Sequence, residues 1–353
     1  MNSSIMPKIS LKIERYQEID ALRGFAIFTM VAANLAGNIL NPPHPFLFRF
    51  YGTFAAPIFI ILSGMMVAMT NKRSNRGINF YLIRGLAVVF IGVFIDLAVW
   101  QYSPFTAFDV LYLIGISMPI TYLATRLSNR ILGFMTGGVF LLTPLLQSLL
   151  GYNVSSPDVL FTLNLNDYLI HSEIYLHRFL IDGWFPLFPW IGFSLFGASL
   201  YRVQLAMGEA FWRWVERTGL LFLTGGGWLW YLFPGGLFVR EGYSELFYPA
   251  TLGYILTAIG VMLLCYRALK ATQSWGVLLF LNRLGQCALL IYVVHYALIR
   301  YVFNVFLPHS SFPVFLLSYA ALIMSMIFLA YAIHELKKKY PEKPAWISFL
   351  IGG

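Results

Sequence analysis

Apolar runs of about 20 residues recur along this chain and restrict its fold more than any other feature. A run of that length is what an α-helix needs to cross the ~30 Å hydrocarbon core of a bilayer. Hydrophobic residues make up 59% of the 353 residues, and charged residues only 11%. The alternation of apolar and polar residues typical of membrane β-strands is absent. The sequence therefore predicts an all-α integral membrane protein.

Ten of these runs are long enough to be transmembrane helices. We expect one transmembrane domain over residues 1–353, with tails at residues 1–20 and 336–353. The predicted spans are 21–40, 53–70, 80–100, 105–125, 131–150, 184–201, 218–235, 246–266, 279–303 and 312–334.

The positions of the Lys and Arg residues predict how these spans are oriented. Of the 24 residues, 17 fall in the two tails and the loops on one side, and four fall on the other side. The remaining three, Arg23, Arg84 and Arg283, lie just inside the spans at the basic side. Positively charged loops stay in the cytoplasm, so both termini are predicted to be cytoplasmic. The net charge of +9 is thus a topology signal, and we expect no nucleic-acid partner.

The first span carries polar groups from one side of the membrane to the other. Asp20 and Arg23 stand at its cytoplasmic start, Asn34 lies roughly 16 Å deeper than Arg23, and His44 follows at the outer end. Polar and ionisable groups inside hydrocarbon are costly and usually functional. The alternative for Asp20 and Arg23 is a simple ion pair between residues three apart at a helix start.

The other polar residues of the spans divide by depth. The outer half collects acids and histidines that could act as bases, and the inner half collects arginines that could bind anions. Each arginine alone could instead extend to lipid headgroups, and His295 could serve packing only. The outer group is Asn34, His44, Asp96, Asp109, Asp182 and His295, and the inner group is Arg23, Arg84 and Arg283.

Four motifs, in order along the chain, resemble those of one enzyme family. Residues 19–27 read IDALRGFAI, and residues 56–59 read APIF. Residues 185–192 read FPLFPWIG, and residues 284–295 read LGQCALLIYVVH. The set is similar to the heparan-α-glucosaminide N-acetyltransferase family of transmembrane acyltransferases, in particular its shorter prokaryotic members.

The resemblance implies an acetyl transfer from cytosolic acetyl-CoA to an amino sugar at the opposite face. It also matches His44 to the family's proposed active-site histidine and Asn34 to the asparagine before it. We expect the N-terminal luminal part of the animal enzymes to be absent, so the acceptor need not be a heparan chain. Direct transfer and an acetyl-histidine intermediate both stay open, as do N- and O-acetylation.

These lines of argument combine in one predicted mechanism. Arg23, Arg84 and Arg283 would hold the phosphates of acetyl-CoA. His44 would act as general base, and Asn34 would donate a hydrogen bond to the thioester carbonyl. Either Asp109 or His295 would orient the base. No metal is predicted.

Two other classes of protein fit the same composition. A secondary transporter or flippase would use the intramembrane acids and histidines as a proton relay. A membrane scaffold without activity would tolerate alanine at the site residues. We favour an enzyme of a prokaryotic plasma membrane, with acetyl-CoA, an extracytoplasmic sugar or glycan and membrane lipids as partners. Small residues scattered through the spans leave a homodimer open.

Overall fold

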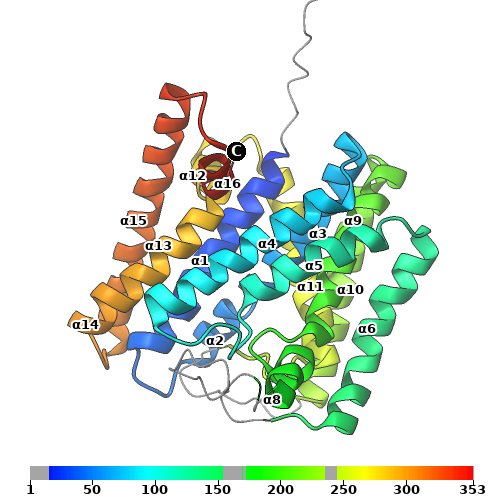
Figure 1. Cartoon of the computed structure of the whole chain (residues 1–353). Helices are drawn as coiled ribbons and strands as arrows, with labels where there is room; N and C mark the ends of the chain where they lie inside the picture. Colours follow the sequence, from blue (N-terminus) through cyan, green and yellow to red (C-terminus); the bar gives the residue numbers. More distant parts are fainter. Residues whose placement is uncertain (1–15, 154–168, 170–171, 235–244, 353) are drawn as a thin grey trace, which may run out of the picture.

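The computed structural model is built of helices (Figure 1). It describes residues 16–153, 169, 172–234 and 245–352. Most of the predicted tail 1–20 therefore lies outside the described residues. The longer helices are α1 (Gln17–Ile39), α3 (Ala55–Ser74), α4 (Ile78–Ile95), α5 (Val110–Ala124), α6 (Asn129–Leu150), α9 (Leu187–Met207), α10 (Ala210–Leu232), α11 (Leu252–Ala271), α13 (Ala288–Leu298) and α15 (Phe312–Lys339). The shorter ones are α2 (Phe46–Gly52), α8 (Ser172–His177), α12 (Leu279–Gln286), α14 (Asn304–Phe306) and α16 (Ala345–Ile351).

The predicted class, an all-α membrane protein, is confirmed. Among the described residues, seven helical segments are long and apolar enough to cross a membrane. An eighth span is formed if Ser172–Asp182 and Leu187–Met207, which meet at 46°, count as one broken segment. Helix α5 is apolar but shorter. The expected number of ten spans and the cytoplasmic placement of both termini stay predictions.

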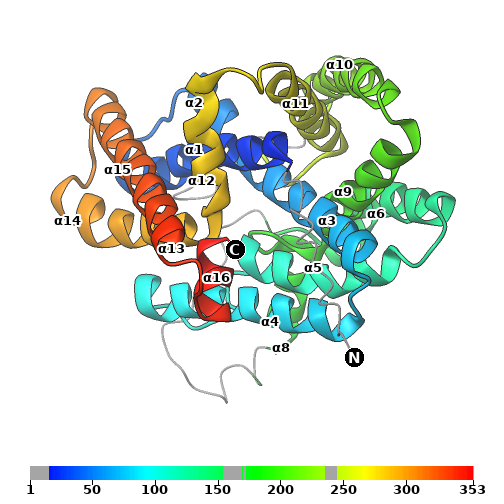
Figure 2. The same cartoon turned by 90° about the horizontal axis from the view of Figure 1, so that it is seen from above.

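The bundle has two ends. We call the end at which α1 begins the basic end, and the other the opposite end. At its basic end lie the start of α1, the ends of α3, α9 and α15, and the C-terminal helix α16 (Figure 1). At its opposite end lie α2, α8 and α14. Viewed from above, α13 and α15 flank one side of α1, and α9, α10 and α11 gather on the other (Figure 2). Helices α1 and α3 thus lie at the centre, where a site would be enclosed.

Glycines let several of these helices approach closely. A Cβ atom on Gly285 of α12 would lie 1.8 Å from the carbonyl oxygen of Asp20 on α1. A Cβ atom on Gly64 of α3 would lie 1.9 Å from the carbonyl oxygen of Ser194 on α9. Small residues drive such contacts in membranes, where helix association cannot rely on the hydrophobic effect. Both pairs hold neighbouring helices against the two central ones.

The predicted span 279–303 is broken into pieces. Helix α12 ends at Gln286, the backbone leaves helical geometry at Cys287, and α13 starts at Ala288. A segment with wider helical turns, Ile299–Phe303, follows directly. The break lies next to the close contact of Gly285 with α1. Helix α13 therefore has its own direction across the bundle and brings its side chains toward the centre.

Candidate active site

Asn34 and His295 meet in the interior, although 261 residues separate them. The side-chain nitrogen Nδ2 of Asn34 lies 3.0 Å from Nε2 of His295. The other ring nitrogen, Nδ1, lies 3.1 Å from the carbonyl oxygen of Ile291, one turn earlier in α13. A carbonyl only accepts, so Nδ1 carries the proton and Nε2 accepts from Asn34. His295 has an exposed fraction of 0%, so nothing from the solvent competes for it.

This arrangement fixes how the Asn34 amide is turned. Nδ2 carries both N–H groups of the amide. One donates to His295, and the other can donate to a second acceptor. Asn38, one turn further along α1, donates to the backbone carbonyl of Asn34 at 2.8 Å. Asn34 is therefore placed as a hydrogen-bond donor at a set angle, as an oxyanion-stabilising group must be.

Asp109 is tied to the same turn of α13. It caps the start of α5, where its side chain accepts from the Val110 N–H at 2.6 Å. Its other oxygen accepts from the Tyr292 hydroxyl at 2.8 Å. Tyr292 and His295 are three residues apart and so share one face of the helix. One turn of α13 thus contacts both Asn34 on α1 and Asp109 on α5.

Asn34 and Asp109 line one small cavity of about 50 Å³. Its walls are mostly apolar and aromatic, with Glu245 as a second carboxylate. Such a lining, apolar with a few convergent polar groups, is typical of small-molecule sites. In this form the cavity has room for a few water molecules only. The aromatic residues are Phe59, Trp184, Phe185, Phe247, Tyr248, Tyr292 and Tyr296.

His44 lies at the end of α1, in the segment that leads to α2. Its Nε2 lies 3.1 Å from the carbonyl oxygen of Leu40 and donates to it, so Nδ1 holds the lone pair. Burial lowers the pKa of His44 from its ordinary 6.5, and the positive charge of Arg49 lowers it further, while the bond to Leu40 acts against both. The imidazole is therefore neutral near pH 7 and able to accept a proton. Among the described residues, the lining of the cavity includes Asn34 and not His44.

Asp96, another acid predicted in this half, is also paired. It accepts from the hydroxyl of Tyr112 on α5, and both side chains are buried. It does not line the cavity of Asn34 as far as the structure describes it.

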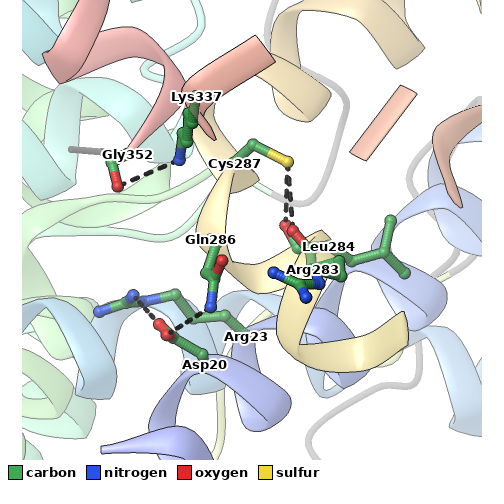
Figure 3. Close-up of polar contacts among 8 residues, drawn as sticks. All are labelled: Asp20, Arg23, Arg283, Leu284, Gln286, Cys287, Lys337 and Gly352. Carbon is green, nitrogen blue, oxygen red and sulfur yellow. Dashed lines mark hydrogen bonds and ion pairs between the residues drawn. The ribbon is translucent and has the colours of Figure 1, made fainter. Parts of the chain in front are cut away.

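The predicted arginines lie at the basic end, each with partners of its own. Arg23 forms an ion pair with Asp20 at 3.0 Å, and Gln286 reaches the same carboxylate at 3.5 Å (Figure 3). Arg283 contacts the ring of His334 on α15. Arg84 lies over the ring of Phe349 in α16 at 5.2 Å. Their shared end of the bundle fits the prediction, and their role toward a cofactor stays a prediction.

Sequence reasoning missed two members of this site. Tyr292 could have been found, because the motif Tyr-x-x-His places it one turn before His295. Glu245 could not, because it precedes α11 in a segment without helical periodicity. Among the described residues, no group of three or more His, Cys, Asp or Glu side chains could hold a metal ion.

A comparison with protein families identifies the chain. Residues 15–228 match the model of the heparan-alpha-glucosaminide N-acetyltransferase catalytic region. The chain belongs to this family. The match covers more than half of the 353 residues and implies a membrane acetyltransferase. It includes Asn34, His44 and Asp109, whereas Arg283 and His295 lie beyond it. No curated protein matches the chain.

Proposed function

We propose that this protein moves an acetyl group from cytosolic acetyl-CoA to an amine or hydroxyl of a sugar or glycan at the far face of the membrane. The observation that carries the proposal is the Asn34–His295 hydrogen bond of 3.0 Å beside a cavity, in a chain of the acetyltransferase family. It supplies a preoriented donor where the thioester carbonyl would have to lie. The basic end supplies cations for the phosphates of CoA.

In the proposed reaction, Asn34 donates its second N–H to the thioester carbonyl oxygen. The acceptor nitrogen or oxygen attacks the carbonyl carbon, and the developing negative charge on the carbonyl oxygen is stabilised by Asn34. The C–S bond then breaks, and CoA leaves as a thiolate that takes up a proton. Nδ1 of His44 removes the proton that the acceptor loses.

The position of His44 requires a movement in this scheme. His44 is hydrogen-bonded to the carbonyl oxygen of Leu40. Leu40 lies six residues beyond Asn34, or roughly 9 Å along the helix. This separation is longer than a single hydrogen bond can span. We therefore expect residues 41–45 to shift toward the cavity when the acceptor binds.

The covalent variant of this mechanism uses the same residues. His44 would attack the thioester itself, release CoA and carry the acetyl group as acetyl-imidazole until the acceptor arrives. Incubation with deuterated acetyl-CoA without acceptor, followed by mass spectrometry of the peptide that contains His44, separates the two. A labelled His44 indicates the covalent route, and an unlabelled peptide with turnover only when both substrates are present indicates direct transfer.

The test of the function itself uses the full chain in proteoliposomes. Acetyl-CoA is supplied on one side and glucosamine on the other, and both free thiol and acetylated sugar are measured. Asn34→Ala should lower product formation by about a hundredfold or more. Asn304→Ala, an asparagine in α14 away from the cavity, serves as the matched control and should leave it unchanged. Uptake of sugar that needs an ion gradient and no acetyl-CoA would instead indicate a transporter.

A further inference from the structure

A second, larger cavity opens at the basic end, away from Asn34. Its volume is about 390 Å³, and it lies between the ends of α3, α5 and α9. Three cations from these three regions line it, Lys72, Arg126 and Arg202. Asn71 and Thr125 line it as well and hydrogen-bond to each other at 3.0 Å.

Two of the three cations are held in place by neighbouring groups. Arg202 donates to the carbonyl oxygens of Thr125 and Leu127, the second at 2.9 Å, and to Oδ1 of Asn129 at 3.0 Å. Arg126 lies over the ring of Tyr122 at 5.0 Å and donates to its hydroxyl. These bonds go to neutral acceptors, so the positive charges are fixed in position but not neutralised.

The charge of this cavity is uncompensated in the described part of the chain. No acidic side chain lines the cavity, and none of the recorded ion pairs involves Lys72, Arg126 or Arg202. Arg23, by contrast, is paired with Asp20. Three like charges around one concave space repel each other and attract an anion.

This cavity is separate from the candidate active site, although residues of α3 and residues at the ends of α5 line both. Between them, Thr121 on α5 contacts Ser194 on α9 through their hydroxyls at 2.8 Å. At the same level Gly64 brings α3 against Ser194. Packed helices therefore separate the two cavities.

We propose that the basic cavity is a binding site for a phosphate-bearing ligand. Arg guanidinium groups recognise phosphate oxygens through paired N–H donors, and Lys adds a mobile point charge. The amide of Asn71 and the hydroxyl of Thr125 offer further polar contacts. Two sources carry this chemistry at a membrane surface: the phosphorylated ribose of a nucleotide such as that of CoA, and the phosphate of an anionic lipid headgroup.

Lys72 provides the cleanest variant, because it is exposed and has no recorded contact among the described residues. Lys72→Gln removes the charge without breaking a structural bond. Arg130→Gln is the matched control, since Arg130 is an exposed cation four residues from Arg126 that does not line the cavity. Thermal midpoints of all forms are compared first, to confirm that they fold alike.

The experiment measures binding of two probes to the purified full chain. Adenosine 3′,5′-bisphosphate is titrated by calorimetry in detergent, and phosphatidylglycerol against phosphatidylcholine is compared by native mass spectrometry. Lys72→Gln should weaken one of the two about tenfold or more, while Arg130→Gln matches the wild type. Loss of nucleotide binding identifies a nucleotide phosphate, and loss of lipid binding alone identifies a headgroup.

Binding of neither probe to the wild type, or equal binding by wild type and Lys72→Gln, overturns the proposal. Acyl transfer is measured separately, with the lipid composition held constant. The proposed function assigns the CoA phosphates to other arginines, so transfer without phosphate binding here refutes only the basic cavity. Phosphate binding without transfer refutes only the proposed function.

Discussion

The Asn34–His295 hydrogen bond leads to a prediction that separates positioning from base catalysis. If His295 acts only by holding the Asn34 amide, replacing it with Phe keeps a ring in α13 and removes the acceptor. A neutral hydrogen bond contributes about 0.5–1.5 kcal/mol, and a buried donor left unpaired costs about 1–3 kcal/mol. We therefore expect His295→Phe to lower kcat about five- to 150-fold. The KM for acetyl-CoA should change little, because the bond matters for orientation in the transition state.

The size of the effect alone does not prove the role, so a double-mutant cycle is needed. Asn34→Ala should lower kcat about 10²- to 10³-fold, as removal of an oxyanion donor does in other enzymes. Once Asn34 is gone, His295 has nothing left to position, so the double variant should be no slower than Asn34→Ala. The assay is release of free thiol from acetyl-CoA in proteoliposomes, with glucosamine as acceptor. His309→Asn, an exposed histidine at the opposite end, serves as control.

Two results would refute this reasoning. If the effects of the two single variants multiply in the double variant, His295 acts independently of Asn34. If His295→Phe removes the acidic limb of the pH–rate profile, His295 is itself the base. In our scheme that limb belongs to His44 and remains in the His295→Phe enzyme.

Three further predictions test the surroundings of the site. Because the pKa of His44 is lowered below 6.5, kcat/KM should hold down to pH values under 6.5 and then fall as the base is protonated; His44→Ala should abolish this limb along with most activity. Asp109→Ala removes a helix cap and should lower stability by about 1 kcal/mol or more, measured as a decrease in thermal midpoint. Gly285→Ala places a methyl group 1.8 Å from the Asp20 carbonyl and should destabilise the protein by about 1–3 kcal/mol, whereas Gly133→Ala, with nothing within 4 Å, should not; equal midpoints would contradict the close packing of α1 and α12.

A common level for Asn34 and His295 along the bundle could be predicted from the sequence, whereas their contact could not. A rise of about 1.5 Å per residue places Asn34 and His295 in the same half of the bilayer. Which side of each helix faces the other depends on how α1 and α13 pack, and no periodicity of either segment reveals it. His295 was expected to orient a base or to pack, and its recorded partner is Asn34.

At the basic end, the number of Lys and Arg residues could likewise be read from the sequence, whereas their arrangement in space could not be predicted. The count of Lys and Arg residues predicts which loops share a side, since charge bias does not depend on packing. It could not reveal that Lys72, Arg126 and Arg202 surround one cavity, although the spacing of three residues did suggest the ion pair of Arg23 with Asp20. Residues treated as topology signals thus line a separate cavity. Of the three arginines expected to bind phosphate, Arg84 and Arg283 have neighbours distant in sequence, Phe349 and His334, which spacing alone could not identify.

The strength of the contacts around Asn34 bears on how substrates could enter. Hydrogen bonds between membrane helices contribute about 0.6 kcal/mol on average, less than the enthalpy of an isolated bond would suggest. The single turn of α13 that carries Tyr292 and His295 is therefore held to α1 and α5 by weak ties, and the break at Cys287 separates it from the closely packed α12. A cavity of about 50 Å³ must enlarge to take an acyl chain and an acceptor. Helix α13 can move to enlarge it, because among the described residues two side-chain hydrogen bonds tie this turn to α1 and α5, and both can break while the glycine contact of α12 with α1 stays intact.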